Sequence, residues 1–301
     1  MRLQSRTFCP LCDSKEVARV LIDELVGTAG LNNFSFASRK SPEGMHYRMV
    51  ICKSCDVAYA NPAPDTSWLH DQYVKADFDT TSESRHAARN HGLLLQSVLS
   101  LLPDRGRALD IGAGDGAFLN ELRALGFAEV EGIEPSSGPL RCASPDNRQV
   151  IHQGFFSDLN LATGAYSLVT CFQTIEHVED AKALAEDVIR LLKPGGLFLV
   201  VCHDFRALSA RLLKHRSPIF DIEHLQLFSP VSLLNFFHQA GYQDIVIAPF
   251  TNRYPIEYWL KLAPTPKGAS RIIERAVSFF RLAKICVPLR AGNLYAYGVS
   301  K

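Results

Sequence analysis

The stretch from Arg107 to Gly116, which reads RALDIGAGDG, constrains the fold of this chain more than any other. Ala108, Leu109 and Ile111 form the short apolar run that is typical of a parallel strand buried on both faces. The glycines that follow allow close approaches of the backbone that a side chain would prevent. A helix that begins at Ala117 would point its free N–H groups back at this turn. The pattern predicts a cradle for a polar small molecule that carries a nucleoside.

The glycine spacing alone does not identify that molecule. Gly112-x-Gly114-x-x-Ala117 also satisfies the dinucleotide-binding fingerprint, and Glu134 lies about where its ribose-binding acid is expected. The surrounding motifs separate a dinucleotide-binding site from a site for another cofactor that carries a nucleoside. They are Asp110 at the end of the strand, Gly116 as a third alternating glycine, Gly132-Ile133-Glu134-Pro135, Glu176-His177-Val178 and Leu192-Lys193-Pro194-Gly195-Gly196. With these motifs in this order, the chain from about Leu101 to Lys301 resembles the class I S-adenosylmethionine-dependent methyltransferases.

This resemblance implies an α/β, Rossmann-like fold whose seven-stranded sheet has the order 3-2-1-4-5-7-6. The antiparallel pairing of the last two strands would distinguish it from a dinucleotide-binding domain. The implied cofactor is S-adenosyl-L-methionine, and the residues implied to bind it are Asp110, Gly112, Gly114, Gly116, Glu134, Pro135, Phe155 and Gln173. The Glu134 carboxylate would accept hydrogen bonds from both ribose hydroxyls. Phe155 or Phe156 would either stack on adenine or fill the core, and both alternatives remain open.

Two Cys-x-x-Cys knuckles precede this region. Cys9-Pro-Leu-Cys12 and Cys52-Lys-Ser-Cys55 are separated by 39 residues. Four thiolates in a tetrahedron suit Zn²⁺, and a set with no open coordination position is structural rather than catalytic. The alternatives are four reduced cysteines that never meet, or a redox pair, which the absence of a thioredoxin-like pattern disfavours. The knuckles predict a small zinc-binding module.

Composition limits the function classes. The 301 residues are 47% hydrophobic, so the chain can bury a substantial core, and its formal net charge is only +1. This near-neutral charge disfavours a surface that coats nucleic acid. The longest apolar runs fall far short of the roughly 18 residues that span a bilayer, and the N-terminus lacks the apolar stretch of a signal peptide. We therefore expect a soluble, cytoplasmic protein; nothing in the sequence indicates its oligomeric state.

The chain divides into a zinc-binding module (1–62), a linker with a helical lead-in (63–102) and a methyltransferase domain (103–301) with an insert (251–292). Several elements follow from hydrophobic periodicity and from capping residues. Helices are expected at 65–73, 89–102, 180–192, from Ala117, and between Ser229-Pro230 and Gly241. Strands are expected at 130–134, 148–152, 167–172, 197–202, 242–250 and 294–299, and residues 76–85 are expected to be irregular.

The zinc knuckles, the Asn61-Pro62 connector and the segment Phe220 to Ser229, which contains Glu223-His224-Leu225, resemble bacterial sugar-modifying methyltransferases that begin with a zinc-binding domain. These include the deoxysugar C-methyltransferases. The resemblance implies His224 as the general base, Glu223 as the residue that orients it, and His177 as the residue that binds or polarises the acceptor. The implied acceptor is a small molecule, or a saccharide linked to a lipid or a nucleotide.

Asp221 stands where the deoxysugar C-methyltransferases carry a tyrosine, and the chain ends without their additional C-terminal domain. Methylation of oxygen is therefore expected at least as much as methylation of carbon. The chain lacks the Asn/Asp-Pro-Pro-aromatic segment of enzymes that methylate base amines, which argues against that acceptor. A zinc-bearing RNA methyltransferase, a Rossmann oxidoreductase that binds NAD, and a non-catalytic binding module remain as alternatives.

The long insert carries a cluster of positive charge. From Leu260 to Gly292 there are seven Lys and Arg residues and one acid, Glu274, and residues 271–284 have the periodicity of an amphipathic helix. A basic amphipathic segment is typical of contact with anionic lipid or with a diphosphate-bearing acceptor. An ordinary solvated helix face has the same pattern. Peripheral membrane contact through residues 260–292 is therefore a hypothesis at this point.

Overall fold

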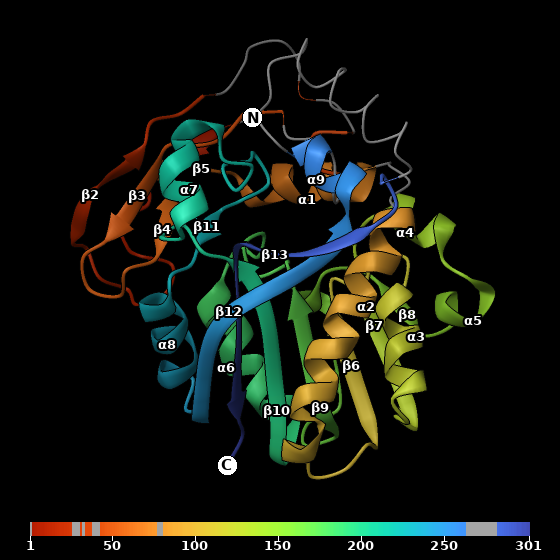
Figure 1. The fold of residues 1–301 in the computed structure, drawn as a ribbon. Coiled ribbons are helices and arrows are strands. Elements are labelled where there is room, and N and C mark those ends of the chain that lie inside the picture. Colours follow the sequence, from red (N-terminus) through yellow and green to blue (C-terminus); the bar gives the residue numbers. More distant parts are fainter. Residues whose placement is uncertain (1, 26–30, 32–33, 38–42, 77–80, 263–281) are drawn as a thin grey trace.

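A seven-stranded sheet forms the centre of the molecule (Figure 1), in a computed structural model that describes residues 2–25, 31, 34–37, 43–76, 81–262 and 282–301. The strand order is β12-β13-β10-β9-β6-β7-β8. The bounds are β6 Arg107–Ile111, β7 Glu129–Glu134, β8 Ile151–Gln153, β9 Tyr166–Phe172, β10 Leu192–His203, β12 Gln243–Pro255 and β13 Cys286–Val299. β13 pairs antiparallel with both β10 and β12, whereas the other pairs are parallel. The predicted order 3-2-1-4-5-7-6 is confirmed.

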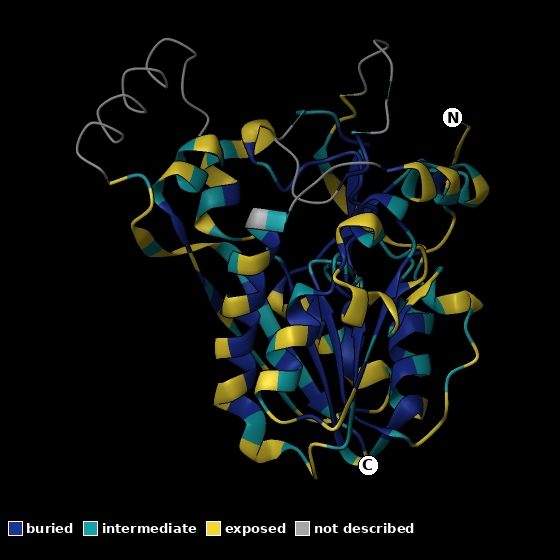
Figure 2. Ribbon diagram, turned by 90° about the vertical axis from the view of Figure 1, so that its right-hand side faces the viewer, coloured by how far each residue is buried: buried dark blue, intermediate teal, exposed yellow. Residues whose placement is uncertain are grey.

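Helices cover both faces of this sheet, as β10 illustrates. Successive residues of a strand point to opposite faces. Leu197, Leu199 and Val201 pack with α2 (Thr81–Val98) and α3 (Ala117–Ala124). The alternate residues of β10, Phe198 among them, pack with α6 (Ala181–Leu191) and α8 (Pro230–Gln239). Figure 2 shows the buried strands enclosed between helices that expose their outer faces. Burial on both faces explains why the part of β10 from Leu197 to Cys202 lacks a polar alternation.

Most predicted helix limits agree with the structure because their capping residues act locally. The Asp180 side chain accepts a hydrogen bond from Ala183 N at the start of α6, and Ser229 forms a capping box with Ser232 at the start of α8. α1 spans Thr66–Lys75, close to the expected helix. The expectation of irregular structure at 76–85 is wrong for its last residues, because α2 begins at Thr81.

The N-terminal module is built on a four-stranded sheet of order β11-β4-β3-β2. Its strands are β2 Val17–Ile22, β3 Met49–Cys52, β4 Ala58–Ala60 and β11 Gln226–Leu227, and β1 Leu3–Gln4 pairs separately with β5 Ala63–Pro64. β11 comes from the methyltransferase domain, where Gln226 pairs with Tyr59 of β4. Cys9, Val50 and Tyr59 of the module belong to the same buried cluster as Leu109 of β6 and Phe228. The module and the large sheet therefore share one core.

The insert is shorter at both ends than the expected range 251–292. It begins later because β12 continues to Pro255, and it ends earlier because β13 already begins at Cys286. α9 (Ile256–Leu262) follows β12 directly. Most of the helix predicted at 271–284 lies outside the described residues. Short elements complete the chain: α4 Ser137–Cys142, α5 Pro145–Arg148, α7 Leu208–Leu213 and the 3-10 turns η1 Leu99–Leu101, η2 Phe156–Asp158 and η3 Lys214–Arg216. No helix among the described residues combines the length and the hydrophobicity needed to cross a membrane.

Candidate active site and metal site

A cavity of about 470 Å³ lies at the carboxyl edge of the parallel strands. In open α/β sheets this edge is where ligands bind. The loops after β6, β7, β9 and β10 line the cavity, and α1, α2, β12 and α9 contribute further residues to it. All predicted cofactor-binding and catalytic residues except Gly116 are among the lining residues, namely Asp110, Gly112, Gly114, Glu134, Pro135, Phe155, Gln173, His177, Glu223 and His224.

The glycines of the loop after β6 have different surroundings. A Cβ built on Gly112 would lie 2.2 Å from Thr174 Oγ1, so this glycine permits the loop to approach the segment after β9. Gly114 has a φ of +56° and no atom within 4 Å of a Cβ built on it, and it lines the cavity. A Cβ built on Gly116 would instead clash with the side chain of Asn147. Gly114 is therefore the glycine that leaves room for a ligand.

Acidic side chains hold this loop in place. The buried carboxylate of Glu134 accepts hydrogen bonds from Gly114 N at 2.9 Å and from Ser136 N at 2.8 Å. Asp110 accepts a hydrogen bond from Thr170 Oγ1 at 2.6 Å. Both acids come at the ends of neighbouring parallel strands, which brings them to one edge of the sheet. The open space at Gly114 beside the Glu134 carboxylate suits the methionine and ribose portions of S-adenosylmethionine.

Aromatic rings lie at the adjoining end of the cavity. Phe155 stacks on His70 of α1, with ring centroids 3.8 Å apart and an interplanar angle of 14°. Phe156 also lines the cavity but packs against the buried core as well. Of the two phenylalanines, Phe155 therefore presents the ring that can join a planar stack with a base.

Three imidazoles gather in the lining of the same cavity. The ring centroids of His177 and His224 are 4.9 Å apart, and those of His203 and His224 are 5.2 Å apart. His224 Nδ1 lies 2.7 Å from Ile219 O. Because a carbonyl can only accept, Nδ1 carries the proton, and the lone pair of a neutral His224 is on Nε2. This tautomer makes His224 Nε2 the basic atom.

Tyr73 of α1 connects His177 with the segment that carries His224. Its hydroxyl lies 3.0 Å from His177 Nδ1 and donates to Glu223 O at 3.2 Å. With the phenol proton given to that carbonyl, His177 donates from Nδ1 to the phenol oxygen. Burial, aided by the Glu223 charge, raises the pKa of Tyr73 well above its usual value, so the phenol stays protonated. Tyr73 therefore orients His177 rather than acting as a base.

Behind the imidazoles, Glu176 is fully buried. Its carboxylate accepts a hydrogen bond from His203 N at 2.7 Å, while Oε2 has no hydrogen-bond partner. Burial raises the pKa of Glu176 to about 7. Burial, together with the neighbouring His224, lowers the pKa of His203 to about 3, so His203 is neutral near pH 7. Glu176 is thus a carboxyl group that the fold favours in its neutral form.

Glu176→Gln should reduce the pH dependence of stability. The unfolded carboxyl titrates near 4.5 and the folded one near 7. The free energy of unfolding therefore falls as pH rises between these values, by about 3 kcal/mol for a shift of this size, and then levels. The variant should lose this decline. The difference in melting temperature between the variant and wild type should therefore shift in favour of the variant from pH 4 to pH 8. Thermal melting from pH 4 to pH 8 tests this prediction, and Glu24→Gln, at an exposed acid, is the control. The raised pKa of Glu176 would be contradicted if the melting temperatures of wild type and Glu176→Gln changed with pH in the same way.

Sequence reasoning missed Tyr73, His70 and His203 as site residues. His203 had a usable signal, because it ends a strand whose carboxyl edge faces the site. Tyr73 and His70 lie on a short helix more than 30 residues before the glycine loop. Their place in the cavity depends on long-range packing, of which the local sequence carries no indication.

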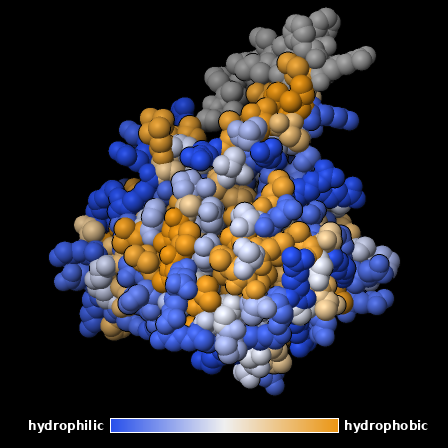
Figure 3. Space-filling view, turned by 60° about the horizontal axis from the view of Figure 1, so that its bottom comes forward, coloured by the Kyte–Doolittle hydropathy of each residue, from blue (hydrophilic) through white to orange (hydrophobic). Residues whose placement is uncertain are grey.

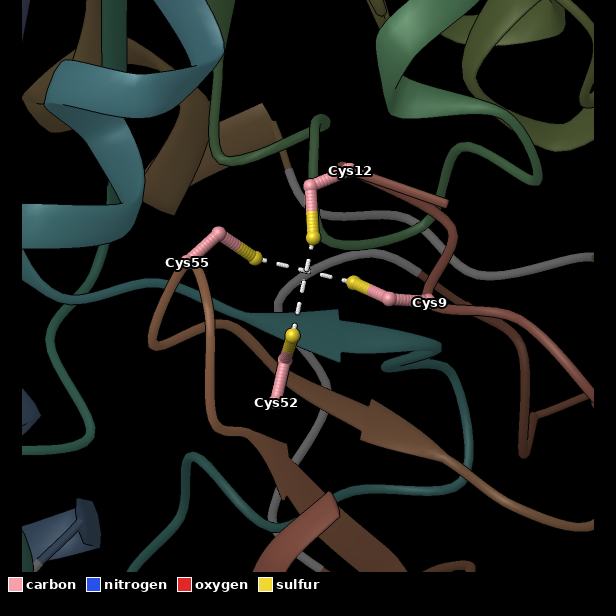
Figure 4. A group of neighbouring side chains, drawn as sticks. All are labelled: Cys9, Cys12, Cys52 and Cys55. Carbon is pink, nitrogen blue, oxygen red and sulfur yellow. Dashed lines mark hydrogen bonds between the residues drawn. The ribbon is translucent and has the colours of Figure 1, made fainter. Parts of the chain in front are cut away.

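The four cysteines of the two knuckles form one cluster. Figure 4 shows their sulfur atoms turned toward a common centre. All four Sγ atoms lie within 4.8 Å of one another, and the Cys9–Cys55 and Cys12–Cys52 pairs are each 3.6 Å apart. A tetrahedron with metal–sulfur bonds of about 2.3 Å requires sulfur–sulfur distances of about 3.8 Å. The hydrogen bond from Cys55 lowers the pKa of Cys9 below its usual value. The cluster could therefore hold a metal ion such as zinc.

Comparison with known proteins identifies the family to which this fold belongs. The family model described as a methyltransferase domain matches residues 84–246, which is more than half of the chain. The chain belongs to this family and is an S-adenosylmethionine-dependent methyltransferase. Ubiquinone biosynthesis O-methyltransferase of Ralstonia nicotianae is 26% identical over 219 residues, 66% of this chain and 92% of that protein. Its counterpart in Marinobacter nauticus is 37% identical over 103 residues, 31% of this chain and 42% of that protein.

Two solved structures are also similar. A SAM-dependent methyltransferase from Thermotoga maritima has 21% identity and a TM-score of 0.49, over 72% of this chain and 91% of that chain. A Haemonchus contortus N-methyltransferase in complex with S-adenosylhomocysteine has 16% identity and a TM-score of 0.46, over 70% of this chain and 52% of that chain. The family assignment rests on the sequence matches and on the strand order. Neither relative from ubiquinone biosynthesis is named for sugar modification, so the saccharide acceptor stays a proposal.

Proposed function

We propose that this enzyme transfers the methyl group of S-adenosylmethionine to an oxygen or a carbon of a saccharide or a related small metabolite. The observation that carries the proposal is that His177 and His224 line the same cavity as Gly114 and Glu134. The bound cofactor supplies an activated sulfonium methyl group. The protein then has to hold the acceptor in line and remove its proton, and imidazoles suit the second task near neutral pH.

His224 is the proposed general base, and His177 the residue that binds the acceptor. The hydrogen bond to Ile219 O directs the lone pair of His224 to Nε2, as a base requires. Glu223 and Asp221 line the same cavity, and polar groups of this kind can bind hydroxyls. Tyr254 and Tyr258 add a stacked aromatic pair, with centroids 4.1 Å apart, at the wall formed by β12 and α9. A sugar ring, which has an apolar face and several hydroxyls, fits such a lining.

His224→Ala should lower kcat by about 100-fold or more, because a positioned general base contributes on the order of 10² to 10⁴. The dissociation constant for S-adenosylmethionine should stay unchanged, since His224 is not among the residues predicted to bind the cofactor. Turnover at saturating cofactor and calorimetry with S-adenosylmethionine measure the two quantities. Full activity in the variant would remove His224 from the mechanism.

A phenolic hydroxyl is the second candidate acceptor. It is favoured by the Ralstonia relative, which is named an O-methyltransferase of ubiquinone biosynthesis and is matched over 92% of its length. Transfer of radiolabelled methyl to nucleotide sugars, glycolipids and prenylated catechols separates the candidates. Methylation of catechols alone would replace the saccharide proposal without changing the assignment of donor and base.

We also propose that Cys9, Cys12, Cys52 and Cys55 bind a structural zinc ion. Support comes from the spacing of the sulfur atoms and from the absence of a disulfide among these four cysteines. Four thiolates leave no coordination position for a substrate, so the ion would stabilise the module rather than take part in methyl transfer. Elemental analysis of the purified protein tests the identity and stoichiometry of the metal.

A further inference from the structure

Two segments far apart in the sequence form one basic surface beside the cavity. They are residues 205–220, which contain α7, and residues 282–301, which contain β13, and neither segment has an Asp or Glu. Ser209 Oγ donates to Ala291 O at 3.1 Å, and a Cβ built on Gly292 would lie 3.1 Å from Ala207 Cβ. The two segments therefore form one continuous region, which we term the α7–β13 surface.

Large apolar side chains project from this surface. Leu208 and Leu212 on α7 are 68% and 71% exposed, the highest values among the large hydrophobic residues of the described chain. Leu282, Ile285 and Leu289 of the second segment are 39%, 49% and 43% exposed. Figure 3, which brings the bottom of the molecule forward, shows that hydrophobic residues also lie between hydrophilic ones on another face. Exposed apolar groups of this size mark an interaction site when they cluster.

Positively charged side chains lie in the same two segments as these apolar groups. They are Arg211, Lys214, Arg216, Lys284 and Arg290, all of them exposed. None of the five forms an ion pair with another described residue. By contrast, Arg206 in the first segment is paired with Asp56. The five cations are therefore available to a partner with negative charge.

The geometry points to the docking of the α7–β13 surface on an anionic lipid bilayer. Apolar side chains between cations match the boundary between headgroups and acyl chains, where leucines enter the apolar layer and cations meet lipid phosphates. RNA would satisfy the cations but leave the leucines in water, since single-stranded RNA is bound by aromatic stacking. A bilayer satisfies both kinds of group.

Docking in this way would bring the cavity to the membrane. Pro218 and Ile219 of the first segment line the cavity, and so do Ala291 and Asn293 of the second. An acceptor carried by a lipid could thus reach His224 without leaving the bilayer. The docking itself does not depend on which acceptor is methylated, and it is measured without donor or acceptor.

Flotation of the full chain with vesicles tests the proposal. We expect binding to vesicles of phosphatidylcholine with about one third phosphatidylglycerol, weak binding to phosphatidylcholine alone, and weaker binding as salt rises. Leu208→Ser/Leu212→Ser and Arg211→Glu/Lys214→Glu should each lower the partition coefficient by about tenfold or more. Arg211→Lys/Lys214→Arg, which keeps the charge, should bind like wild type.

Val231→Ser/Leu234→Ser is the matched control, because these side chains are 52% and 48% exposed on α8, which belongs to neither segment of the α7–β13 surface. It should bind vesicles like wild type, and all variants should keep their affinity for S-adenosylmethionine. The proposal is overturned if wild type fails to float with anionic vesicles, if the α7 variants float like wild type, or if the chain binds RNA and not vesicles. If the protein transfers methyl groups but does not bind vesicles, the docking proposal is overturned and the proposed function is unaffected.

Discussion

Gly114→Val should raise the dissociation constant for S-adenosylmethionine by at least about 100-fold. The space around the Gly114 Cβ position belongs to the cavity, so the valine side chain would occupy ligand volume. A β-branched residue is also strained at a φ of +56°, and a shift of this backbone would disturb the hydrogen bond from Gly114 N to Glu134. Isothermal titration calorimetry with S-adenosylmethionine and S-adenosylhomocysteine measures the effect.

Gly164→Val is the matched control for this prediction. Gly164 has a φ of +60° and no atom within 4 Å of its Cβ position, but it does not line the cavity. The control variant therefore has the same backbone strain without the loss of ligand space. Both variants should lose stability, and only Gly114→Val should lose the cofactor. If Gly114→Val binds the donor normally, the pocket has been placed wrongly.

Cys12→Ser should abolish stoichiometric zinc binding and lower the melting temperature by more than about 5 °C. A structural zinc ion contributes folding free energy directly, and a loss of a few kcal/mol shifts the melting temperature by about 2–4 °C per kcal/mol in larger domains. The cysteines Cys9, Cys52 and Cys55 belong to the buried cluster that also contains Leu109 of the central sheet. The damage should therefore spread beyond the module. Elemental analysis and thermal melting measure both effects.

Cys142→Ser supplies the control for loss of a thiol, because Cys142 is exposed and lies outside the cluster. It should keep both the metal content and the melting temperature. At a temperature where Cys12→Ser remains folded, its affinity for S-adenosylmethionine should equal that of wild type, since the cysteines do not line the cavity. A Cys12→Ser protein that retains one zinc ion per chain would refute the four-cysteine site.

Much of the cofactor side of the site was predictable because its groups are close in sequence. The strand, the glycine turn and the helix that starts at Ala117 are formed by neighbouring residues with strong backbone preferences. The hydrogen bond from Gly114 N to Glu134 joins two adjacent parallel strands, whose carboxyl ends must meet. On the proposed acceptor side, the resemblance pointed to His177 and His224, which line the cavity, and their roles stay a prediction. The contact of Tyr73 with His177 joins residues 104 positions apart and was not predicted.

The sequence by itself predicted the family and the four cysteines from short motifs, and the resemblance to the family implied the strand order. Tertiary structure alone decided which groups share the cavity: the stacking of His70 on Phe155, the place of His203 beside His224, and the burial that raises the pKa of Glu176 to about 7. It also decided that β11 completes the sheet of the N-terminal module. These features arise when distant segments are packed into one core, and no local preference of the chain specifies that packing.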